Sequence, residues 1–206
     1  AFCAGGDIQS MRDNADADGS AAVFLKTLTV PLHGAIATLA RMQKPVIAAV
    51  NGVAAGAGFS IALACDLILA TESAKFTMAY TRIGAVPDGS STYFLPRAVG
   101  FKRAYDLIVN NRVLSAAEAR DMGIVSEIFA DGEFADQALA YTQRLAAGPT
   151  LALGRAKQLL TSSGAETLET QMEHERRAIA ASGATADFIE GTKAFLAKRK
   201  PDFTGS

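Results

Sequence analysis

The sequence predicts an α/β fold followed by an all-helical region. Continuous apolar runs of strand length alternate with helical patterns in the first part of the chain, which is typical of sheets covered on both faces. After Asp131-Gly132 only helical patterns remain. We therefore expect an α/β region over residues 1–133 and a helical region over residues 134–206, which is short for an independent core.

The elements of the α/β region follow from hydrophobic spacing and turn residues. Leucines recur at helical spacing in the first element, where Pro31 predicts a kink or a restart. We expect a helix at 20–42, a strand at 46–50, an Asn-Gly turn at 51–52, a small-residue helix at 56–64 and a second buried strand at 67–71. Ser115 and Glu118 then match a capping box that opens a short helix ending at Gly123. A last strand is expected at 124–129.

Helical patterns fill the C-terminal region. Pro149 suits the first turn of a helix, and glycines mark the breaks between patterns. The four expected helices cover 134–147, 149–161, 167–182 and 186–199. Such a region is expected to pack on the first region or on another subunit.

Composition excludes several classes of protein. Of 206 residues, 20 are basic and 21 acidic, a net charge of −1 that gives no attraction to nucleic acid or to an anionic membrane. Residues 46–70 are long enough to span a membrane, but glycines interrupt them and Asp66 would be costly there. The 2 cysteines fit no metal spacing, and the 2 histidines leave little chance of a zinc site. Because the 2 cysteines lie far apart in sequence, a reducing compartment is the simpler interpretation, and we expect a cytoplasmic protein without a metal.

Two glycine-rich turns are the best candidates for chemistry. The dinucleotide fingerprint fails because Ile61 stands at its third glycine, and the P-loop, the Gly-x-Ser-x-Gly elbow and the His-Glu-x-x-His motif do not occur. The turns Ala4-Gly5-Gly6 and Gly56-Ala57-Gly58 can bring main-chain N–H groups close to a ligand. The second turn also opens a helix, whose N-terminus favours a developing negative oxygen.

Four ordered motifs then resemble a known family: FCAGGDI at 2–8, KPVIAAVNGVAAGAG at 44–58, AKF at 74–76 and PRAVG at 96–100. They are similar to motifs of the crotonase (enoyl-CoA hydratase/isomerase) superfamily, over essentially the whole chain. The resemblance implies a ClpP-like spiral of ββα units with a C-terminal helical trimerisation region. It also implies an acyl-CoA thioester substrate, no cofactor besides the CoA of that substrate, and a homotrimer or dimer of trimers. Because the motif at 2–8 normally follows earlier ββα structure, we expect the chain to lack the first strands of the fold.

The resemblance assigns roles to residues. In that family two backbone N–H groups hold the thioester carbonyl, and by motif position these belong to Gly6 and Ala57. Two fixed donors stabilise an enolate oxygen, whose charge exists only after a proton has left the neighbouring carbon. The other expected substrate-binding residues surround them: Ala4, Asp7, Ile8, Val53, Ala55, Gly58, Tyr80, Pro87 and Asp88.

The expected acid/base is Asp88, in a Pro-Asp-Gly turn. The branch of enoyl-CoA isomerases, which includes the 1,2-epoxyphenylacetyl-CoA isomerase of phenylacetate breakdown, has its acid/base aspartate in such a turn. Hydratases of the family instead resemble one another in having two glutamates, where this chain has Ser60 and Tyr80. A serine and a tyrosine relay protons poorly near neutral pH. We therefore expect an isomerase in which Asp88 takes a proton from one carbon and returns it at another, with a hydratase as the second hypothesis.

Further alternatives stay open. His33 and Asp88 fall where the 4-chlorobenzoyl-CoA dehalogenase branch has a histidine and a nucleophilic aspartate, although Tyr80 replaces a tryptophan of that branch. Without a function, His33 would be a partly buried helix residue and Asp88 a turn residue that caps the next helix. Loss of both glutamates is also compatible with a non-catalytic relic that binds acyl-CoA.

Overall fold

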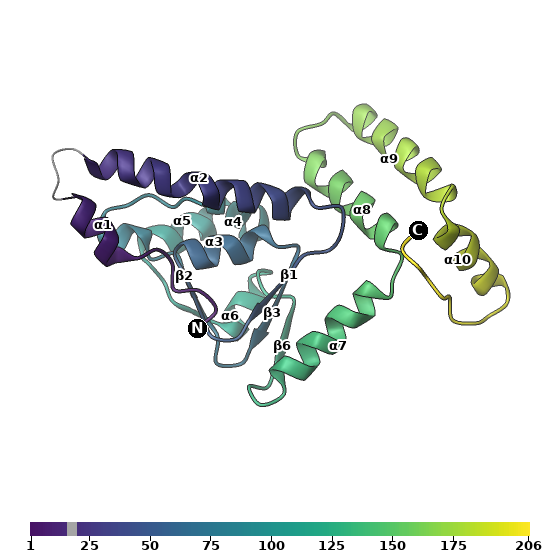
Figure 1. Cartoon of the computed structure of the whole chain (residues 1–206), viewed down its shortest axis with the longest axis horizontal. Helices are drawn as coiled ribbons and strands as arrows, with labels where there is room; N and C mark the ends of the chain where they lie inside the picture. The colour runs from purple at the N-terminus through teal and green to yellow at the C-terminus, as the bar shows by residue number, and fades with distance from the viewer. Residues whose placement is uncertain (16–19) are drawn as a thin grey trace. The chain divides into compact units, whose positions relative to one another are not determined.

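The computed structural model describes residues 1–15 and 20–206, and these divide into two compact units (Figure 1). Unit 1 comprises Ala1–Ala40 and Ile47–Ala138, and unit 2 comprises Arg41–Val46 and Leu139–Ser206. Every strand of the described residues lies in unit 1, and the second unit is helical. The separate roles that the sequence predicts for residues 1–133 and 134–206 stay a prediction.

The strands of unit 1 form two three-stranded sheets in the described residues, with orders β1-β3-β6 and β2-β4-β5. All neighbours in the first sheet are parallel, whereas β2 pairs with β4 in parallel and β4 with β5 antiparallel. The strands are β1 (Ile47–Val50), β2 (Val53–Ala55), β3 (Leu67–Thr71), β4 (Lys75–Thr77), β5 (Leu114–Ser115) and β6 (Glu127–Phe129). The predicted strands at 46–50 and 67–71 are confirmed, and the one at 124–129 is shorter than expected.

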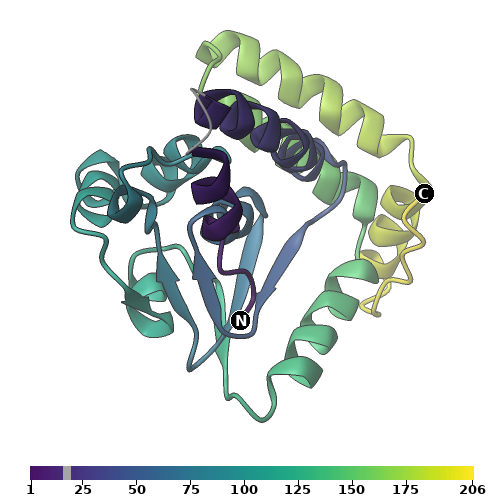
Figure 2. The same cartoon turned by 60° about the vertical axis from the view of Figure 1, so that its left-hand side comes forward.

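Helices surround the strands of unit 1 (Figure 2). They are α1 (Ile8–Ala15), α2 (Ser20–Arg41), α3 (Ala57–Ala64), the 3₁₀ helix η1 (Tyr80–Ile83), α4 (Ser91–Val99), α5 (Phe101–Val109), α6 (Ala116–Asp121) and α7 (Phe134–Ala146), the last of which continues into unit 2. The predicted capping box of Ser115 and Glu118 is present at the start of α6. The expected restart at Pro31 is wrong, because α2 continues through that residue as one helix.

The core of unit 1 is centred on α3, which is apolar in sequence and buried along nearly its whole length. A helix that is apolar on all sides has to be buried on all sides. Phe59 of this helix packs against Phe76 of β4, with ring centroids 5.4 Å apart. The apolar residues 46–70 thus form β1, β2, α3 and most of β3 within a folded core, as the sequence predicted in preference to a single membrane span.

Helix α2 has a different character from α3. Within the described residues it contains the one segment, Ala21–Arg41, that is long and apolar enough to cross a membrane. The mean hydropathy of its most apolar stretch is 1.4. The match is one of length and composition alone, and most of the segment is exposed. Ile36 is its buried exception, at 3% exposure. This part of α2 therefore packs on the rest of unit 1, and His33 lies one turn before Ile36.

Unit 2 consists of the end of α7 and of three further helices: α8 (Thr150–Ser163), α9 (Leu168–Gly183) and α10 (Ala186–Leu196). All four helices predicted for the C-terminal region are present. The last residues fold back onto α10, because the Asp187 carboxylate accepts hydrogen bonds from the N–H groups of Thr204 (2.7 Å) and Gly205 (3.0 Å). Arg199 adds two hydrogen bonds to Glu190, at 2.6 and 2.9 Å.

Candidate active site

The two glycine-rich turns are brought together by strand pairing. The N–H of Ala55 donates a hydrogen bond to the carbonyl of Cys3 at 2.9 Å, and Cys3 forms a parallel bridge with Ala54. Paired parallel strands advance together along both chains. The bridge brings the turn at residues 4–6 alongside the turn at residues 56–58, and a Cβ atom built on Gly56 would lie 3.9 Å from Cα of Gly5.

The close approach of the turns depends on residues without side chains. A Cβ atom built on Gly5 would lie 3.6 Å from the nitrogen of Ala57, and one built on Gly58 would collide with the carbonyl of Cys3. Ala57 is the first residue of α3, so its N–H has no acceptor within the helix. Over residues 1–15 and 20–206, neither this N–H nor that of Gly6 donates a hydrogen bond to the protein. Neither predicted donor is therefore used within the described protein, and their role in binding an oxyanion stays a prediction.

Asp88 lies in a hydrogen-bonded cluster beside these turns. The Tyr80 hydroxyl donates to Oδ1 of Asp88 at 2.7 Å, and Oγ of Ser60 lies 2.9 Å from the Tyr80 oxygen. Nε2 of His33 lies 3.8 Å from Oδ2 of Asp88, which is longer than a hydrogen bond. Side chains from α2, α3 and η1 therefore meet at the Asp88 turn.

The carboxylate of Asp88 does not cap α4. The N-cap residue of that helix is Ser90, and its side chain makes no capping hydrogen bond. Ser91 donates to the main-chain carbonyl of Asp88, from its N–H at 3.1 Å and from its hydroxyl at 2.8 Å. The interpretation of Asp88 as a helix-capping turn residue is therefore wrong, and its carboxylate is left for Tyr80 and the site.

Gly89 holds the Asp88 turn against the helix that carries Ala57. Its φ of +58° is in the left-handed region, and a Cβ there would lie 2.9 Å from Cβ of Ser60 and 3.2 Å from Cδ1 of Ile36. The N–H of Ser60 donates to the carbonyl of Gly56 at 3.0 Å, which places Ser60 in the first turn of α3. The Asp88 turn and the predicted donor Ala57 are thus linked through the first turn of α3.

Burial has its clearest effect within the cluster on the pKa of Tyr80. Burial of the Tyr80 hydroxyl is the largest influence on its pKa and raises it well above the usual range, while the hydrogen bond from Ser60 lowers it and the Asp88 carboxylate raises it. Tyr80 therefore keeps its proton at neutral pH and acts as a donor. A predicted site residue of opposite character is Asp7, whose pKa is lowered chiefly by the hydrogen bond from the Ser10 hydroxyl at 2.6 Å.

The remaining predicted substrate-binding residues differ in their exposure. Asp7 accepts hydrogen bonds from the N–H groups of Gln9 (3.0 Å) and Ser10 (3.3 Å), so it caps α1. Ala4, Ile8 and Val53 are exposed, Ala55 and Pro87 are half-buried, and Gly58 is buried beneath Cys3. Their contacts with a substrate stay a prediction.

Sequence reasoning missed the link between Ser60, Tyr80 and Asp88. It treated the first two as positions that had lost a glutamate, and no periodicity relates residues separated by a 3₁₀ turn and a loop. The interpretation of His33 as partly buried and silent is wrong in its burial, because its side chain is 52% exposed and faces Asp88. Its position beside the buried Ile36 on α2 is the one signal in the sequence that pointed inward.

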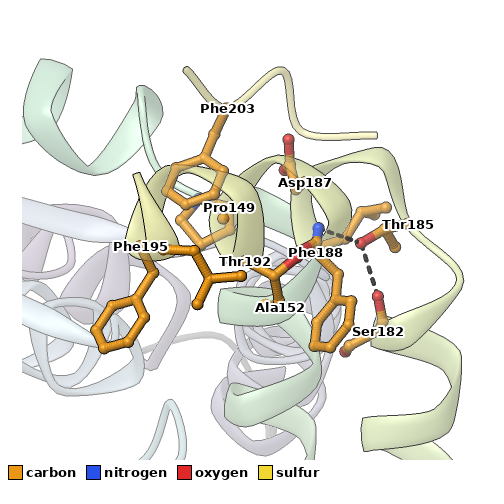
Figure 3. A pocket seen from close by; sticks show the side chains of 12 residues that line it. Pro149, Ala152, Ser182, Thr185, Asp187, Phe188, Thr192, Phe195 and Phe203 are labelled. Carbon is orange, nitrogen blue, oxygen red and sulfur yellow. Dashed lines mark hydrogen bonds between the residues drawn. The ribbon is translucent and has the colours of Figure 1, made fainter. Parts of the chain in front are cut away.

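Two features lie outside this cluster or concern the whole described chain. In the parts of the chain that the structure describes, no group of three or more His, Cys, Asp or Glu side chains is arranged to hold a metal ion. A hollow of about 480 Å³ lies in unit 2, between the start of α8, the helix α10 and the C-terminal residues (Figure 3). Phe188, Phe195 and Phe203 form part of its apolar wall, and it contains none of the predicted catalytic residues.

Fold and site together define an α/β protein in which two glycine-rich turns approach each other and a tyrosine of a 3₁₀ helix holds one carboxylate. The sequence profile described as enoyl-CoA hydratase/isomerase matches residues 1–206. A 1,2-epoxyphenylacetyl-CoA isomerase of Escherichia coli (strain K12) is 42% identical over 99% of this chain and 77% of its own length. The chain therefore belongs to the enoyl-CoA hydratase/isomerase family of acyl-CoA enzymes, as the sequence motifs predicted.

Other relatives carry other activities in their names. The 4-chlorobenzoyl coenzyme A dehalogenase-1 of an Arthrobacter species is 36% identical, over 96% of this chain and 71% of its own. The crystal structure of an enoyl-CoA hydratase from Polaromonas sp. JS666 superposes with a TM-score of 0.89 at 34% identity, covering 98% of this chain and 77% of that one. The likeness confirms the predicted crotonase fold. Family membership alone does not select among isomerase, dehalogenase and hydratase.

Proposed function

We propose that this protein is an enoyl-CoA isomerase that moves a double bond of an unsaturated acyl-CoA through an enolate. Asp88 is the acid/base, and the N–H groups of Gly6 and Ala57 hold the thioester oxygen. The observation that carries the proposal is the Asp88 carboxylate, which leaves α4 uncapped and is instead held by Tyr80 beside the first turn of α3.

The proposed reaction needs one base and no cofactor. With a 3-enoyl-CoA, Asp88 removes a proton from C2, and the electron pair of that C–H bond moves into the enolate, whose oxygen is stabilised by Gly6 and Ala57. The same carboxyl group then delivers the proton to C4. The electron pair of the former C3=C4 bond forms the new C–H bond, and the product is the 2-enoyl-CoA.

Substrate class and assembly belong to the same proposal. An acyl-CoA thioester is what the family and the paired donors favour. A homotrimer or dimer of trimers is what the sequence resemblance implies, and large exposed apolar side chains on α10 support such an assembly: Phe195 is 84% and Leu196 82% exposed in the single chain. Burying such side chains on another subunit would be favourable.

The test of this function is double-bond isomerisation by purified protein. Conversion of 3-enoyl-CoA to 2-enoyl-CoA is measured for the wild type, for Asp88→Asn and for the control Asp121→Asn, which changes an exposed aspartate at the end of α6. We expect Asp88→Asn to lower kcat by roughly 1,000-fold, because general acid–base catalysis contributes on that order, and the control to keep wild-type activity. Wild-type turnover by Asp88→Asn would overturn the assignment.

A dehalogenase is a further candidate, and the nearness of His33 to Asp88 favours it. In that reaction Asp88 attacks the ring carbon of a 4-chlorobenzoyl-CoA, chloride leaves with its bonding electron pair, and water hydrolyses the resulting ester. Chloride release from this substrate separates the two functions. Hydration of 2-enoyl-CoA, measured alongside, tests the hydratase. Binding of acyl-CoA in calorimetry, without any turnover, would indicate a non-catalytic relic.

A further inference from the structure

We infer that Tyr80 is a positioning residue that fixes Oδ1 of Asp88 and leaves Oδ2 as the oxygen that takes up and returns the proton. The inference rests on the proposed isomerase function and adds an assignment of the working atom. It follows from the hydrogen bonds, the number of protons available to make them, and the groups around the carboxylate.

The protons of the cluster can be placed one by one. Tyr80 has a single hydroxyl proton, and the 2.7 Å contact with Oδ1 of Asp88 uses it, because an ionised carboxylate only accepts. Ser60 must then be the donor in its 2.9 Å contact with Tyr80, in preference to the carbonyl of Gly56 at 3.3 Å. The order of donation runs from Ser60 to Tyr80 to Asp88.

The raised pKa of Tyr80, caused chiefly by burial, keeps this order intact at neutral pH. Ser60 is itself fully buried in the first turn of α3, at 0% exposure. The chain of hydrogen bonds therefore begins at a fixed helix and ends at Oδ1. A carboxylate held in this way resists rotation that would exchange its two oxygens.

The other oxygen of the carboxylate, Oδ2, has fewer partners than Oδ1. In the described parts of the chain it accepts no hydrogen bond, and Nε2 of His33 at 3.8 Å is its charged neighbour when that ring is protonated. The titratable groups facing the carboxylate there are His33 from α2 and Tyr80 from η1, while α3 contributes Ser60 and α4 contributes Ser91. A proton accepted at Oδ2 disturbs none of these hydrogen bonds, whereas a proton at Oδ1 would displace the Tyr80 donor.

The use of a single carboxylate oxygen determines the geometry of both proton transfers. The proton leaves C2 and arrives at C4 from the same atom, so both transfers occur on one face of the enolate. Because Oδ1 is held and the Asp88 side chain is only 27% exposed, part of the original hydrogen should remain on the product instead of exchanging with water.

The experiment compares Tyr80→Phe with Tyr105→Phe, a matched change at an exposed tyrosine of α5. We expect Tyr80→Phe to lower kcat roughly 10- to 100-fold with little change in KM, the loss typical of one hydrogen bond to a charged group. Removing that donor also favours the protonated carboxyl group, which is inactive as a base. Activity should therefore begin to fall at a higher pH on the acidic side in Tyr80→Phe than in the wild type or in Tyr105→Phe.

Isotope retention provides a second readout. When 3-enoyl-CoA is converted in D₂O, we expect the wild type to carry measurable protium from C2 to C4 and Tyr80→Phe to carry less. Ser60→Ala should show the same changes at smaller size, because it removes the donor to Tyr80 and leaves Tyr80 in place. If Tyr80→Phe does not fold, as judged by circular dichroism, Ser60→Ala carries the same test.

The outcomes separate the two levels of the proposal. If Asp88→Asn isomerises as fast as the wild type, the proposed function itself fails. If Asp88→Asn is inactive while Tyr80→Phe matches Tyr105→Phe in kcat, pH profile and protium retention, the positioning role fails alone. A uniform loss of rate at all pH values with unchanged retention indicates a structural effect and also overturns the inference.

Discussion

The two halves of the candidate active site are built by different means. The proposed oxyanion half consists of main-chain N–H groups, those of Gly6, three residues after the bridge of Cys3 with Ala54, and of Ala57 at the start of α3. The acid–base half uses the side chains of Ser60, Tyr80 and Asp88 in series. The first half therefore depends on the path of the backbone, whereas the second half depends on the chemical identity of each residue.

The largest effect that would test this contrast is the removal of one backbone donor. Ala57→Pro deletes the N–H at the first helical position, where proline is well tolerated. Gly56 before it has φ 53° and ψ −125°, outside the helical region that a following proline disfavours. We expect kcat to fall by about 100-fold or more, because one oxyanion donor is lost, with the melting temperature nearly unchanged.

The matched control is Ala57→Gly, which alters the side chain and keeps the N–H. It should retain kcat close to the wild-type value in the same isomerisation assay. Equal losses in Ala57→Pro and Ala57→Gly would contradict the view that only the backbone of this residue acts.

The same contrast explains what the sequence could predict. The buried strands were predicted from continuous apolar runs, and Gly6 and Ala57 were assigned from motifs that specify a backbone path, an assignment that stays a prediction. The hydrogen bonds of Tyr80 with Ser60 and Asp88 were not found, because they depend on how η1 packs on α3. The short strands β2, β4 and β5 were missed as well, since segments of two or three residues carry no measurable periodicity.

An intermediate effect is expected at Gly58, which supports the backbone half without contacting its donors. A Cβ atom there would collide with the carbonyl and Cβ of Cys3, so the N-terminal segment has to move. We expect Gly58→Ala to cost on the order of 1–3 kcal/mol of stability, and to lower activity because Gly6 moves with that segment. Thermal unfolding and turnover measure the two effects.

Gly132→Ala is the control for this change, because no atom lies within 4 Å of a Cβ built at that glycine. It should leave stability and activity nearly as they are. A Gly58→Ala protein as stable and active as Gly132→Ala would show that the close approach of the turns is unimportant.

The smallest expected effect concerns the hydroxyl of Tyr80, which should stay protonated in mildly alkaline solution. Because the pKa of Tyr80 is raised above its ordinary value of 10.0, its hydroxyl stays protonated at a pH where an ordinary tyrosine is half ionised. We expect wild type and Tyr80→Phe to show the same phenolate absorbance at that pH. An additional phenolate signal in the wild type would mean that Tyr80 ionises normally and is not held in the cluster.

The bridge between Cys3 and Ala54 also sets an order of events during folding. It joins segments that are distant in sequence, and closing such a loop costs chain entropy before any contact is gained. The core around α3 can collapse without it, but Gly6 has no fixed place until it closes. Recovery of activity during refolding should therefore follow protection of the Ala55 amide, which hydrogen-bonds to Cys3, and lag behind burial of the core.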